Sequence, residues 1–526
     1  MAKNRPTASF LFWGILLLGL ALRIYQIGAK SFWFDESASI WISQRPLAGV
    51  LPELVRSEEN PPLYYLLLHF WMAWGRSETV LRALSALFSV LTLPVMYLIG
   101  IRLGGRALGL LAMFILAVAP MHVHYAQDAR DYALLTLNAS LALLCMVILL
   151  EDPTMREGRL FRRPDPAAGV GWLRANVARL GMSVFTALTF LSHNTGIFLP
   201  ASVAVFIALV FVPPALRNWR AGKSSAPPDR RWLNWTLLLV LAGVLCLPWL
   251  PDFLFQVREL RGGFWIPAPS VGGCLKIFRE FFSGSVPENR RMIILDLGAF
   301  FALIVLGAWS LRKKSVPWLL LLLAWGPFAG ELLASLARPI LLSRTLIWST
   351  VPFYLLLSAG LLQLRFRLLQ AVALAVIVAQ AAFSLKSYYD SPAAEDWRAA
   401  AAWVAPRLGP HDVIVFTDCS GQIAFDYYFL KLGVAAEEHG IPVDVVGADG
   451  YSDTEYPPYQ YSNQATAAAL PRLQQVVSGH PRVWFCYLHS KDYDPSGVVL
   501  NWLDTHLARK AEQPYVGVTI YQFDQP

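Results

Sequence analysis

The chain has 526 residues, of which 56% are hydrophobic and only 15% are charged, and its formal net charge is +8. A soluble protein carries about 25% charged residues, so this composition and a mean hydropathy of +0.46 exclude an ordinary soluble domain. Short basic loops orient membrane proteins, so the positive charge predicts no nucleic-acid partner. The five cysteines are scattered, without the spacing of a zinc site or a disulfide framework.

About eleven hydrophobic runs follow one another along the chain, each near the roughly 20 residues that a helix needs to cross a bilayer. They span residues 10–27, 79–101, 106–121, 131–150, 176–192, 197–213, 233–250, 292–311, 317–336, 346–362 and 368–385. The first run lacks a small-residue cleavage site, so we expect a retained helix. The fold class predicted is therefore an α-helical polytopic membrane protein.

Basic residues gather in the short loops on one side, which predicts that this side and the N-terminus are cytoplasmic. The apolar segment 63–74 is not counted as a membrane span, because in helical form it is only about 18 Å long. If it crossed the membrane, the basic loops would face outward, so we expect a helix in the outer interface. This topology places several polar residues on the outer face: Asp35, Glu36, Asn60, Asp128, His193, Asn194 and Arg344.

The composition changes after Lys386, where helix and strand patterns alternate. Helices are predicted over 395–407, 422–432, 471–477 and 498–510, and strands over 413–417, 443–446, 483–488 and 516–523. Four short strands with helices between them indicate a small α/β domain. We therefore expect a transmembrane domain over residues 1–386 and an extracytoplasmic α/β domain over residues 387–526.

Two adjacent acids, Asp35 and Glu36, follow the first hydrophobic run. A carboxylate near apolar walls has a raised pKa and can act as a general base toward an acceptor hydroxyl. The alternative is a solvated pair of loop acids beside interfacial aromatic anchors. A base at the mouth of a cavity and a solvated pair both fit this short motif.

A second polar cluster spans residues 121–132 between two hydrophobic runs. If a helix begins near Gln127, Asp128 and Asp131 lie in its first turn, which by itself indicates only an ordinary helix start. That does not explain the other charged and polar residues of the stretch, His122, His124 and Arg130. The arginine can bind a phosphate with two hydrogen bonds, and the histidines can donate to phosphate or bind a metal.

Two outer turns complete the set of candidates. His193 lies in a tight turn, where a histidine is often only a satisfied polar group. Arg338 and Arg344 lie in one loop, where they can neutralise a phosphate or extend toward lipid headgroups.

The order of these motifs resembles that of the GT-C glycosyltransferases. Phe34-Asp35-Glu36, Asn60-Pro61-Pro62-Leu63-Tyr64-Tyr65 and Tyr125-Ala126-Gln127-Asp128-Ala129-Arg130-Asp131-Tyr132-Ala133-Leu134 are similar to motifs of the bacterial branch related to protein O-mannosyltransferases and the lipid A aminoarabinose transferase. Ser192-His193-Asn194, Ser343-Arg344 and Glu395-Asp396-Trp397-Arg398 resemble later motifs. The resemblance covers the chain to about residue 385 and departs at Asp128, where relatives often have Glu, and at Asn194, where they often have an aromatic residue.

The resemblance implies a membrane glycosyltransferase of the cytoplasmic membrane. It would move a sugar from a polyprenyl phosphate to a hydroxyl of a glycan, lipid or protein on the outer face, with inversion. The catalytic residues expected are Asp35, Glu36 and Asp128, with Asp35 as the base. The residues expected to bind the donor phosphate or the substrate are Asn60, Tyr64, His122, His124, Tyr125, Arg130, His193 and Arg344.

The resemblance leaves the metal question open, because some members of this class use a divalent ion and others need none. Asp35 and Asp128 are the expected ligands if an ion is bound. The rival function is a transporter or flippase of a lipid-linked or anionic substrate, because intramembrane charges also mark transport paths. Transporters often have internal repeats, and none is visible here.

Overall fold

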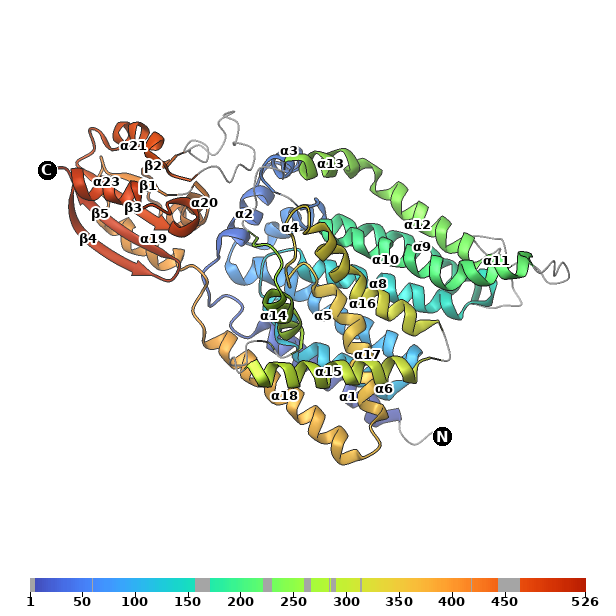
Figure 1. Cartoon of the computed structure of the whole chain (residues 1–526). Helices are drawn as coiled ribbons and strands as arrows, with labels where there is room; N and C mark the ends of the chain where they lie inside the picture. Colours follow the sequence, from blue (N-terminus) through green and yellow to red (C-terminus); the bar gives the residue numbers. More distant parts are fainter. Residues whose placement is uncertain are drawn as a thin grey trace.

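The computed structural model of the chain describes residues 5–58, 60–156, 171–220, 229–259, 266–282, 284, 290–312, 315–417, 419–442 and 464–526. A large helical part and a small α/β part lie end to end (Figure 1). The N-terminus lies at the end of the helical part that is farther from the α/β domain.

The helical part begins with α1 and ends with α18. Its helices are α1 (Arg5–Ile24), α2 (Phe34–Ser43), α3 (Leu47–Ser57), α4 (Leu63–Trp71), α5 (Glu78–Gly104), α6 (Arg106–Val118), α7 (Pro120–His124), α8 (Tyr132–Glu151), α9 (Gly171–Ser192), α10 (Phe198–Phe206), α11 (Val212–Arg220), α12 (Arg231–Cys246), α13 (Leu250–Glu259), α14 (Val271–Phe282), α15 (Arg290–Ser310), α16 (Val316–Ala334), α17 (Thr350–Gln363) and α18 (Arg367–Asp390).

Within the described ranges, seven helical segments are long and apolar enough to cross a membrane. They are Glu78–Gly104, Tyr132–Glu151, Asn194–Leu216, Arg231–Arg258, Ile293–Ser310, Val316–Ala334 and Arg367–Asp390. Three apolar helices are shorter: Ser9–Ile24, Arg106–Val118 and Ile347–Gln363. The eleven predicted runs correspond to these ten segments and α9, which does not meet the same criteria.

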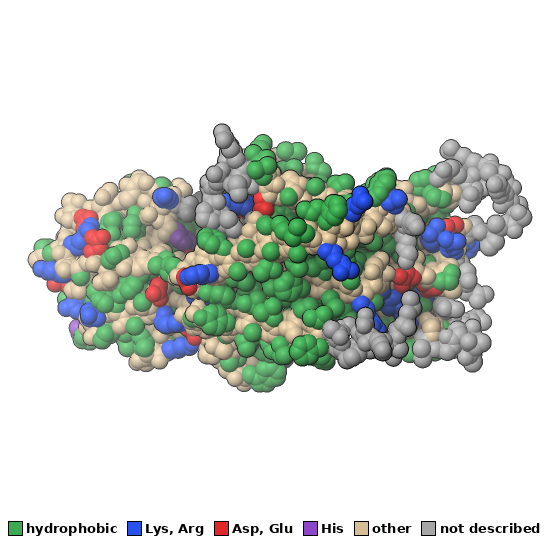
Figure 2. Space-filling view, turned by 90° about the horizontal axis from the view of Figure 1, so that it is seen from below, with side chains coloured by type: hydrophobic (Ala, Val, Ile, Leu, Met, Phe, Trp, Pro, Cys, Tyr) green, Lys and Arg blue, Asp and Glu red, His purple; other side chains and the backbone are tan. Residues whose placement is uncertain are grey.

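The surface of the helical part is apolar around its middle. Figure 2 shows one face on which hydrophobic side chains dominate the centre, while charged side chains gather at the two ends. Large apolar side chains of the helical part, such as Leu17, Val305 and Leu368, are more than half exposed. A soluble monomer rarely exposes so large an apolar area, so this belt is the surface expected to face lipid.

The α/β domain is built on one five-stranded sheet in the order β2-β1-β3-β5-β4. Its strands are β1 (Val413–Phe416), β2 (Glu437–Gly440), β3 (Arg482–Leu488), β4 (Ala508–Tyr515) and β5 (Val518–Asp524). β1 is parallel to β2 and β3, whereas β5 is antiparallel to β3 and β4. The accompanying helices are α19 (Trp397–Val404), α20 (Cys419–Phe429), α21 (Leu470–Val477), α22 (Ser490–Tyr493) and α23 (Val498–His506).

The predicted α/β domain differs from the structure in its last helix and in two strands that were missed. The last predicted helix, 498–510, ends at His506, and the chain continues as β4. The predicted strand 443–446 lies outside the described residues, and β2 was not predicted. Both missed strands are edge strands with polar sequences, so they lack the apolar alternation by which strands are recognised. α18 continues past the proposed domain boundary at residue 386 to Asp390.

Candidate active site

The two adjacent acids Asp35 and Glu36 lie in the first turn of α2, where negative charge is favourable, but they face different surroundings. The side chain of Glu36 is only 1% exposed. It accepts hydrogen bonds from the Nε and Nη2 atoms of Arg82 at 2.7 and 2.6 Å and from the backbone N–H of Ala129 at 2.8 Å. Glu36 is therefore a buried, fully engaged carboxylate.

Arg82 binds backbone groups in addition to the carboxylate of Glu36. Its Nη atoms donate to the backbone carbonyls of Ile27, Lys30 and Ser31 at 2.9 to 3.1 Å. The guanidinium thus holds the backbone of segment 27–36, the connection between α1 and the start of α2. A single arginine of helix α5 organises the segment that ends in the two acids.

Asp35 is more accessible, with its side chain 19% exposed. Its Oδ2 lies 3.3 Å from Nη1 of Arg344, which reaches α2 from the loop before α17. The guanidinium of Arg344 lies 5.5 Å from the ring centroid of Trp33 and 5.9 Å from that of Tyr132. Asp35 thus pairs with a cation that is itself held between aromatic rings.

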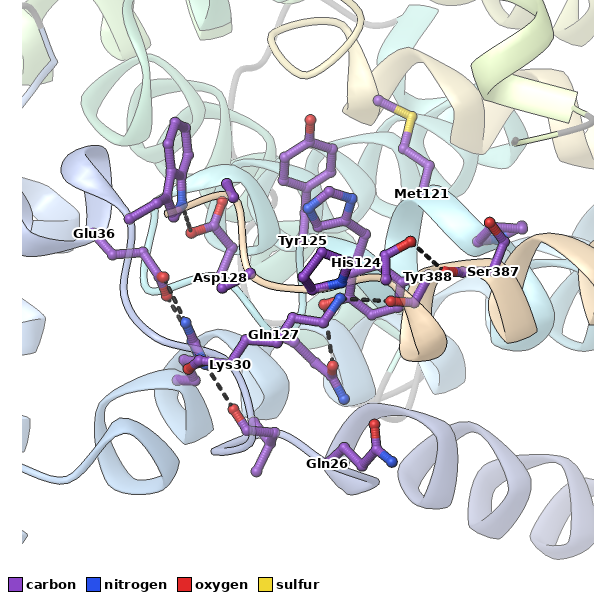
Figure 3. A pocket seen from close by; sticks show the side chains of 18 of the residues that line it. Gln26, Lys30, Glu36, Met121, His124, Tyr125, Gln127, Asp128, Ser387 and Tyr388 are labelled. Atoms are coloured by element: carbon purple, nitrogen blue, oxygen red, sulfur yellow. Dashed lines mark hydrogen bonds and ion pairs between the residues drawn. The ribbon is translucent and has the colours of Figure 1, made fainter. Parts of the chain in front are cut away.

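A cavity of about 520 Å³ opens beside this pair. Segment 26–36, residues 120–128 and the C-terminal end of α18 converge on it (Figure 3). Its polar lining includes Lys30, Trp33, Glu36, Arg82, His124, Tyr125, Gln127, Asp128, Glu280, Arg344 and Tyr388. Asp35 is not among the described lining residues, and it contacts the cavity wall through Arg344.

Asp128 is a buried carboxyl in this wall. Its Oδ1 accepts a hydrogen bond from Trp33 Nε1 at 3.2 Å, and its Oδ2 has no hydrogen-bond partner among the described residues. Burial, and then the negative charge of Glu36, raise the pKa of Asp128 to about 8. At neutral pH this side chain is therefore a neutral acid that can donate a hydrogen bond.

Two further residues of the cavity wall, Lys30 and His124, pack against the ring of Tyr388. Lys30 Nζ donates to the carbonyl of Tyr388 at 2.5 Å and lies 3.9 Å from the centroid of that ring. His124 stacks between Tyr125 and Tyr388, at 4.7 and 4.8 Å. Partial desolvation in the cavity wall, followed by the charges of Lys30, Arg82 and Arg344, lowers the pKa of His124, although its side chain remains exposed. The cations facing the cavity are thus Lys30, Arg344 and the engaged Arg82.

Arg130 lies away from the cavity lining. Its Nη1 pairs with Glu58 at 3.0 Å and donates to Ser39 Oγ at 3.0 Å and to the backbone carbonyl of Asp35 at 3.2 Å. Asn60 Nδ2 in turn donates to Glu58 at 3.0 Å. This buried cluster contacts α2 on the side away from the cavity lining. Arg130 and Asn60, which the sequence motifs suggested as ligands of the donor phosphate or substrate, therefore contact protein groups.

Three other predicted site residues are also engaged with the protein. Tyr64 Oη hydrogen-bonds to Ser85 Oγ at 3.0 Å. His122 Nε2 lies 2.6 Å from Thr350 Oγ1, and His193 Nδ1 accepts from the backbone N–H of Thr195 at 3.1 Å. Burial lowers the pKa of both histidines to about 3, so each is neutral. These three residues support the site from outside the cavity.

The metal hypothesis finds little support in this geometry. In the described ranges, no group of three or more His, Cys, Asp or Glu side chains is arranged to hold a metal ion. Asp35 is paired with Arg344, whose positive charge opposes a second cation at the same carboxylate. We therefore derive no catalytic step from a metal ion.

Several residues of the site were not predicted from the sequence. Arg82 carried a usable signal, because a lone arginine in an apolar helix needs a buried partner. Lys30 carried a weaker one, as a cation five residues before Asp35. Glu58 and Tyr388 carried none, because only the fold brings them to this place.

The comparisons with known proteins concern the family and the fold. Residues 31–162 match the family described as dolichyl-phosphate-mannose-protein mannosyltransferase, and this segment includes Asp35, Glu36 and the cluster 121–132. A comparison with curated protein sequences finds no match.

The fold has relatives among solved structures. ArnT from Cupriavidus metallidurans in the apo state matches 99% of this chain and 98% of its own at 14% identity, with a TM-score of 0.62. The same protein bound to undecaprenyl phosphate matches at 14% identity over 99% and 98% of the two chains, with a TM-score of 0.58. The archaeal oligosaccharyltransferase AglB from Archaeoglobus fulgidus, in complex with an inhibitory peptide and a dolichol-phosphate, matches at 11% identity over 99% of this chain and 74% of its own, with a TM-score of 0.56.

Identities this low establish the fold alone. The helices, the sheet domain and the match along almost the whole length confirm the predicted fold class. The chain is a multi-pass membrane protein with a fold like that of ArnT, and its residues 31–162 match the dolichyl-phosphate-mannose-protein mannosyltransferase family.

Proposed function

We propose that this protein is a glycosyltransferase of the cytoplasmic membrane. It transfers a sugar from a polyprenyl phosphate to a hydroxyl of a glycan, lipid or protein on the outer face. The observation that carries the proposal is the pair of Asp35 and Arg344 at the edge of a cavity that also presents Lys30 and the neutral acid Asp128. A base and an anion-binding group side by side are what such a transfer requires.

The donor class is supported by the fold relatives. One ArnT structure is described as bound to undecaprenyl phosphate and the AglB structure as a complex with a dolichol-phosphate. Both ligands are polyprenyl phosphates, and a lipid tail of this kind explains why a sugar-transferring enzyme has so large an apolar belt. The basic loops favour an active site and an α/β domain on the extracytoplasmic side.

In the proposed reaction Asp35 accepts the proton of the acceptor hydroxyl. The hydroxyl oxygen forms a bond to the anomeric carbon while the bond from that carbon to the phosphate oxygen breaks, so the centre inverts. Polyprenyl phosphate leaves with the electron pair of the broken bond. A donor phosphate beside Arg344 competes for its guanidinium, which frees the carboxylate of Asp35 to act as the base.

The remaining groups stabilise charge and geometry. Arg344 and Lys30 face the cavity as cations and offset the negative charge that grows on the leaving phosphate. Asp128, protonated near neutral pH, can donate a hydrogen bond from Oδ2 to a donor oxygen. Glu36 and Arg130 are assigned positioning roles, because their charges are already used within the protein.

The test is a transfer assay on the purified protein with a panel of radiolabelled polyprenyl-phosphate sugars. We expect release of polyprenyl phosphate by the wild type and none by Asp35→Asn, with no loss of activity when a chelator is added. Binding of one donor without turnover by the wild type would contradict the proposal and favour the transporter function. Loss of turnover with chelator would contradict the metal-independent mechanism only.

A further inference from the structure

The α/β domain contacts the segment that leads to Asp35. Arg398, near the start of α19, donates to three successive backbone carbonyls, those of Gly28, Ala29 and Lys30, at 3.0 to 3.2 Å. The same guanidinium pairs with Glu78 at the start of α5, at 2.7 Å. The first residues of the α/β domain are therefore bound to the membrane part beside the candidate active site.

Two more bonds continue along the same backbone. The N–H of Phe32 donates to Tyr428 Oη at 2.7 Å, and the N–H of Phe34 donates to Glu395 Oε2 at 3.0 Å. Segment 27–36 is thus held from one side by Arg82 of a membrane helix and from the other by three residues of the α/β domain. These contacts end one residue before Asp35.

The hydrogen bond from the N–H of Phe34 to Glu395 caps the start of α2. Phe34 is the first residue of α2, and the residue before it, Trp33, makes no side-chain capping bond. The first N–H groups of a helix have no partner within the helix and need an external acceptor. Glu395 supplies that acceptor from a position 361 residues away, and a carboxylate at this end also favours the helix dipole.

Glu395 is itself held firmly. It is almost fully buried, its Oε2 also accepts from Trp397 Nε1 at 2.7 Å, and its Oε1 lies 3.0 Å from His489 Nε2. His489 occupies the left-handed region with φ 43°, which is unusual for a residue other than glycine. The carboxylate is therefore fixed by two partners of its own domain before it meets α2.

We propose that Glu395 is a positioning residue of the active site. It caps α2 from the α/β domain and so fixes the direction in which Asp35 points, which makes the α/β domain a required part of the active site rather than an appendage. This inference rests on the proposed function for its kinetic consequence, but the capping bond itself can be tested without any transfer reaction.

The first experiment compares full-length wild type with Glu395→Ala and Glu395→Gln. We expect Glu395→Ala to lower kcat by about tenfold or more, because a small misplacement of a reacting group has effects of this size, with the donor KM changed by less than about twofold. Glu395→Gln keeps an acceptor oxygen for Phe34 and should restore most of kcat. An unchanged kcat in Glu395→Ala would overturn the proposal.

The second experiment measures hydrogen exchange of the amides of residues 34–37 in the same variants. Faster exchange in Glu395→Ala is expected, and Arg398→Ala is the matched control because it removes another contact of the same interface. Equal acceleration in Arg398→Ala would show general undocking and overturn the assignment to Glu395. If the wild type transfers no sugar, the proposed function fails, while this exchange result still decides the capping bond.

Phe34→Pro removes the donor instead of the acceptor and leaves the α/β domain intact. Proline is favoured at the first position of a helix, and Trp33 already has the extended backbone (φ −96°, ψ 174°) that suits a residue before proline. If Glu395→Ala does not fold, Phe34→Pro alone should reproduce the loss of kcat. Where both fold, the double variant should be no slower than either single variant, and additive losses would contradict a shared bond.

Discussion

Two groups of ion pairs meet at α2, and they differ in how accessible their charged side chains are to a ligand. In one group Glu36 pairs with Arg82 and Glu58 with Arg130, and all four side chains are at most 10% exposed. In the other, Asp35 pairs with Arg344, and both are nearly one-fifth exposed. The buried pairs hold the backbone around α2, whereas the more exposed pair of Asp35 and Arg344 can be opened by a ligand.

This difference shows that residues of one short motif can have different roles because each contacts a different, distant part of the chain. Asp35 and Glu36 are adjacent in sequence and occupy the same helical turn. What separates them is that Glu36 meets Arg82 of α5 and Asp35 meets Arg344 of the loop before α17. In the proposed mechanism, this motif of two acids therefore supplies both the base, Asp35, and a residue that supports it, Glu36.

Asp35→Asn should show the largest effect on catalysis. Loss of a general base lowers kcat by about 10² to 10⁴-fold, and the amide preserves the volume of the side chain. Transfer rates and the melting temperature of the detergent-solubilised protein would be measured together. Glu53→Gln, which alters an acid of α3 that lies 3.7 Å from Arg45, is the control and should keep the wild-type rate. Full activity of Asp35→Asn would remove Asp35 as the base.

Arg82→Met should show the largest effect on stability. It leaves Glu36 buried without its cation, which costs about 3 to 5 kcal/mol of folding free energy. The measurement is the fraction of folded protein recovered after detergent extraction, together with its melting temperature. Adding Glu36→Gln should restore much of the loss, because no charge then remains unpaired. A single variant as stable as the wild type would show that the pair does not hold segment 27–36.

Arg344→Ala should act mainly on donor binding. A hydrogen bond between charged groups contributes about 1.5 to 3 kcal/mol, so the donor KM should rise by about tenfold or more, with a smaller change in kcat. Arg338→Ala, in the same loop, is the matched control. An unchanged donor KM in Arg344→Ala would argue against a phosphate at this cation.

Asp128→Asn should have an effect on stability that depends on pH. The pKa of Asp128 is raised from its ordinary 3.8 to about 8, so the stability contributed by its neutral form is complete below about pH 4 and is lost as the pH rises through about 8. The wild type should therefore lose melting temperature relative to the permanently neutral Asp128→Asn between about pH 5 and pH 9. Parallel melting curves across that range would show that Asp128 is not protonated in the folded protein.

The sequence predicted the helices of the membrane part well, because each is a long apolar run with its own signal. It also placed Asp35, Glu36, Asp128 and Arg344 on one face, and the structure gathers these residues in and beside one cavity, whereas Asn60 and His193 of the same predicted set lie outside its lining. The alternation of helix and strand in the α/β domain was equally readable, except at the two polar edge strands. The division between membrane part and α/β domain near residue 386 remains a proposal.

The separation of roles within the motifs could not be predicted from the sequence. Whether an acid is buried depends on which cation reaches it, and Arg82, Glu58 and Arg344 arrive from other elements of the chain. Arg130 is the instructive case, since its spacing suggested a phosphate ligand and its buried contact with Glu58 makes it a support of α2. The capping of α2 by Glu395 spans even more of the sequence, and the motif that begins at Glu395 gave no indication of this contact.

The most direct measurement compares two folded variants in a single-turnover assay of polyprenyl phosphate release. One is Asp35→Asn, and the other is the double variant Glu36→Gln with Arg82→Met, which replaces the buried pair by neutral side chains of similar size. We expect the first to lose transfer and the second to stay within about tenfold of the wild type, because a buried ion pair can often be replaced by neutral groups. Transfer that persists in Asp35→Asn and disappears in the folded double variant would contradict the separation of base and support at α2.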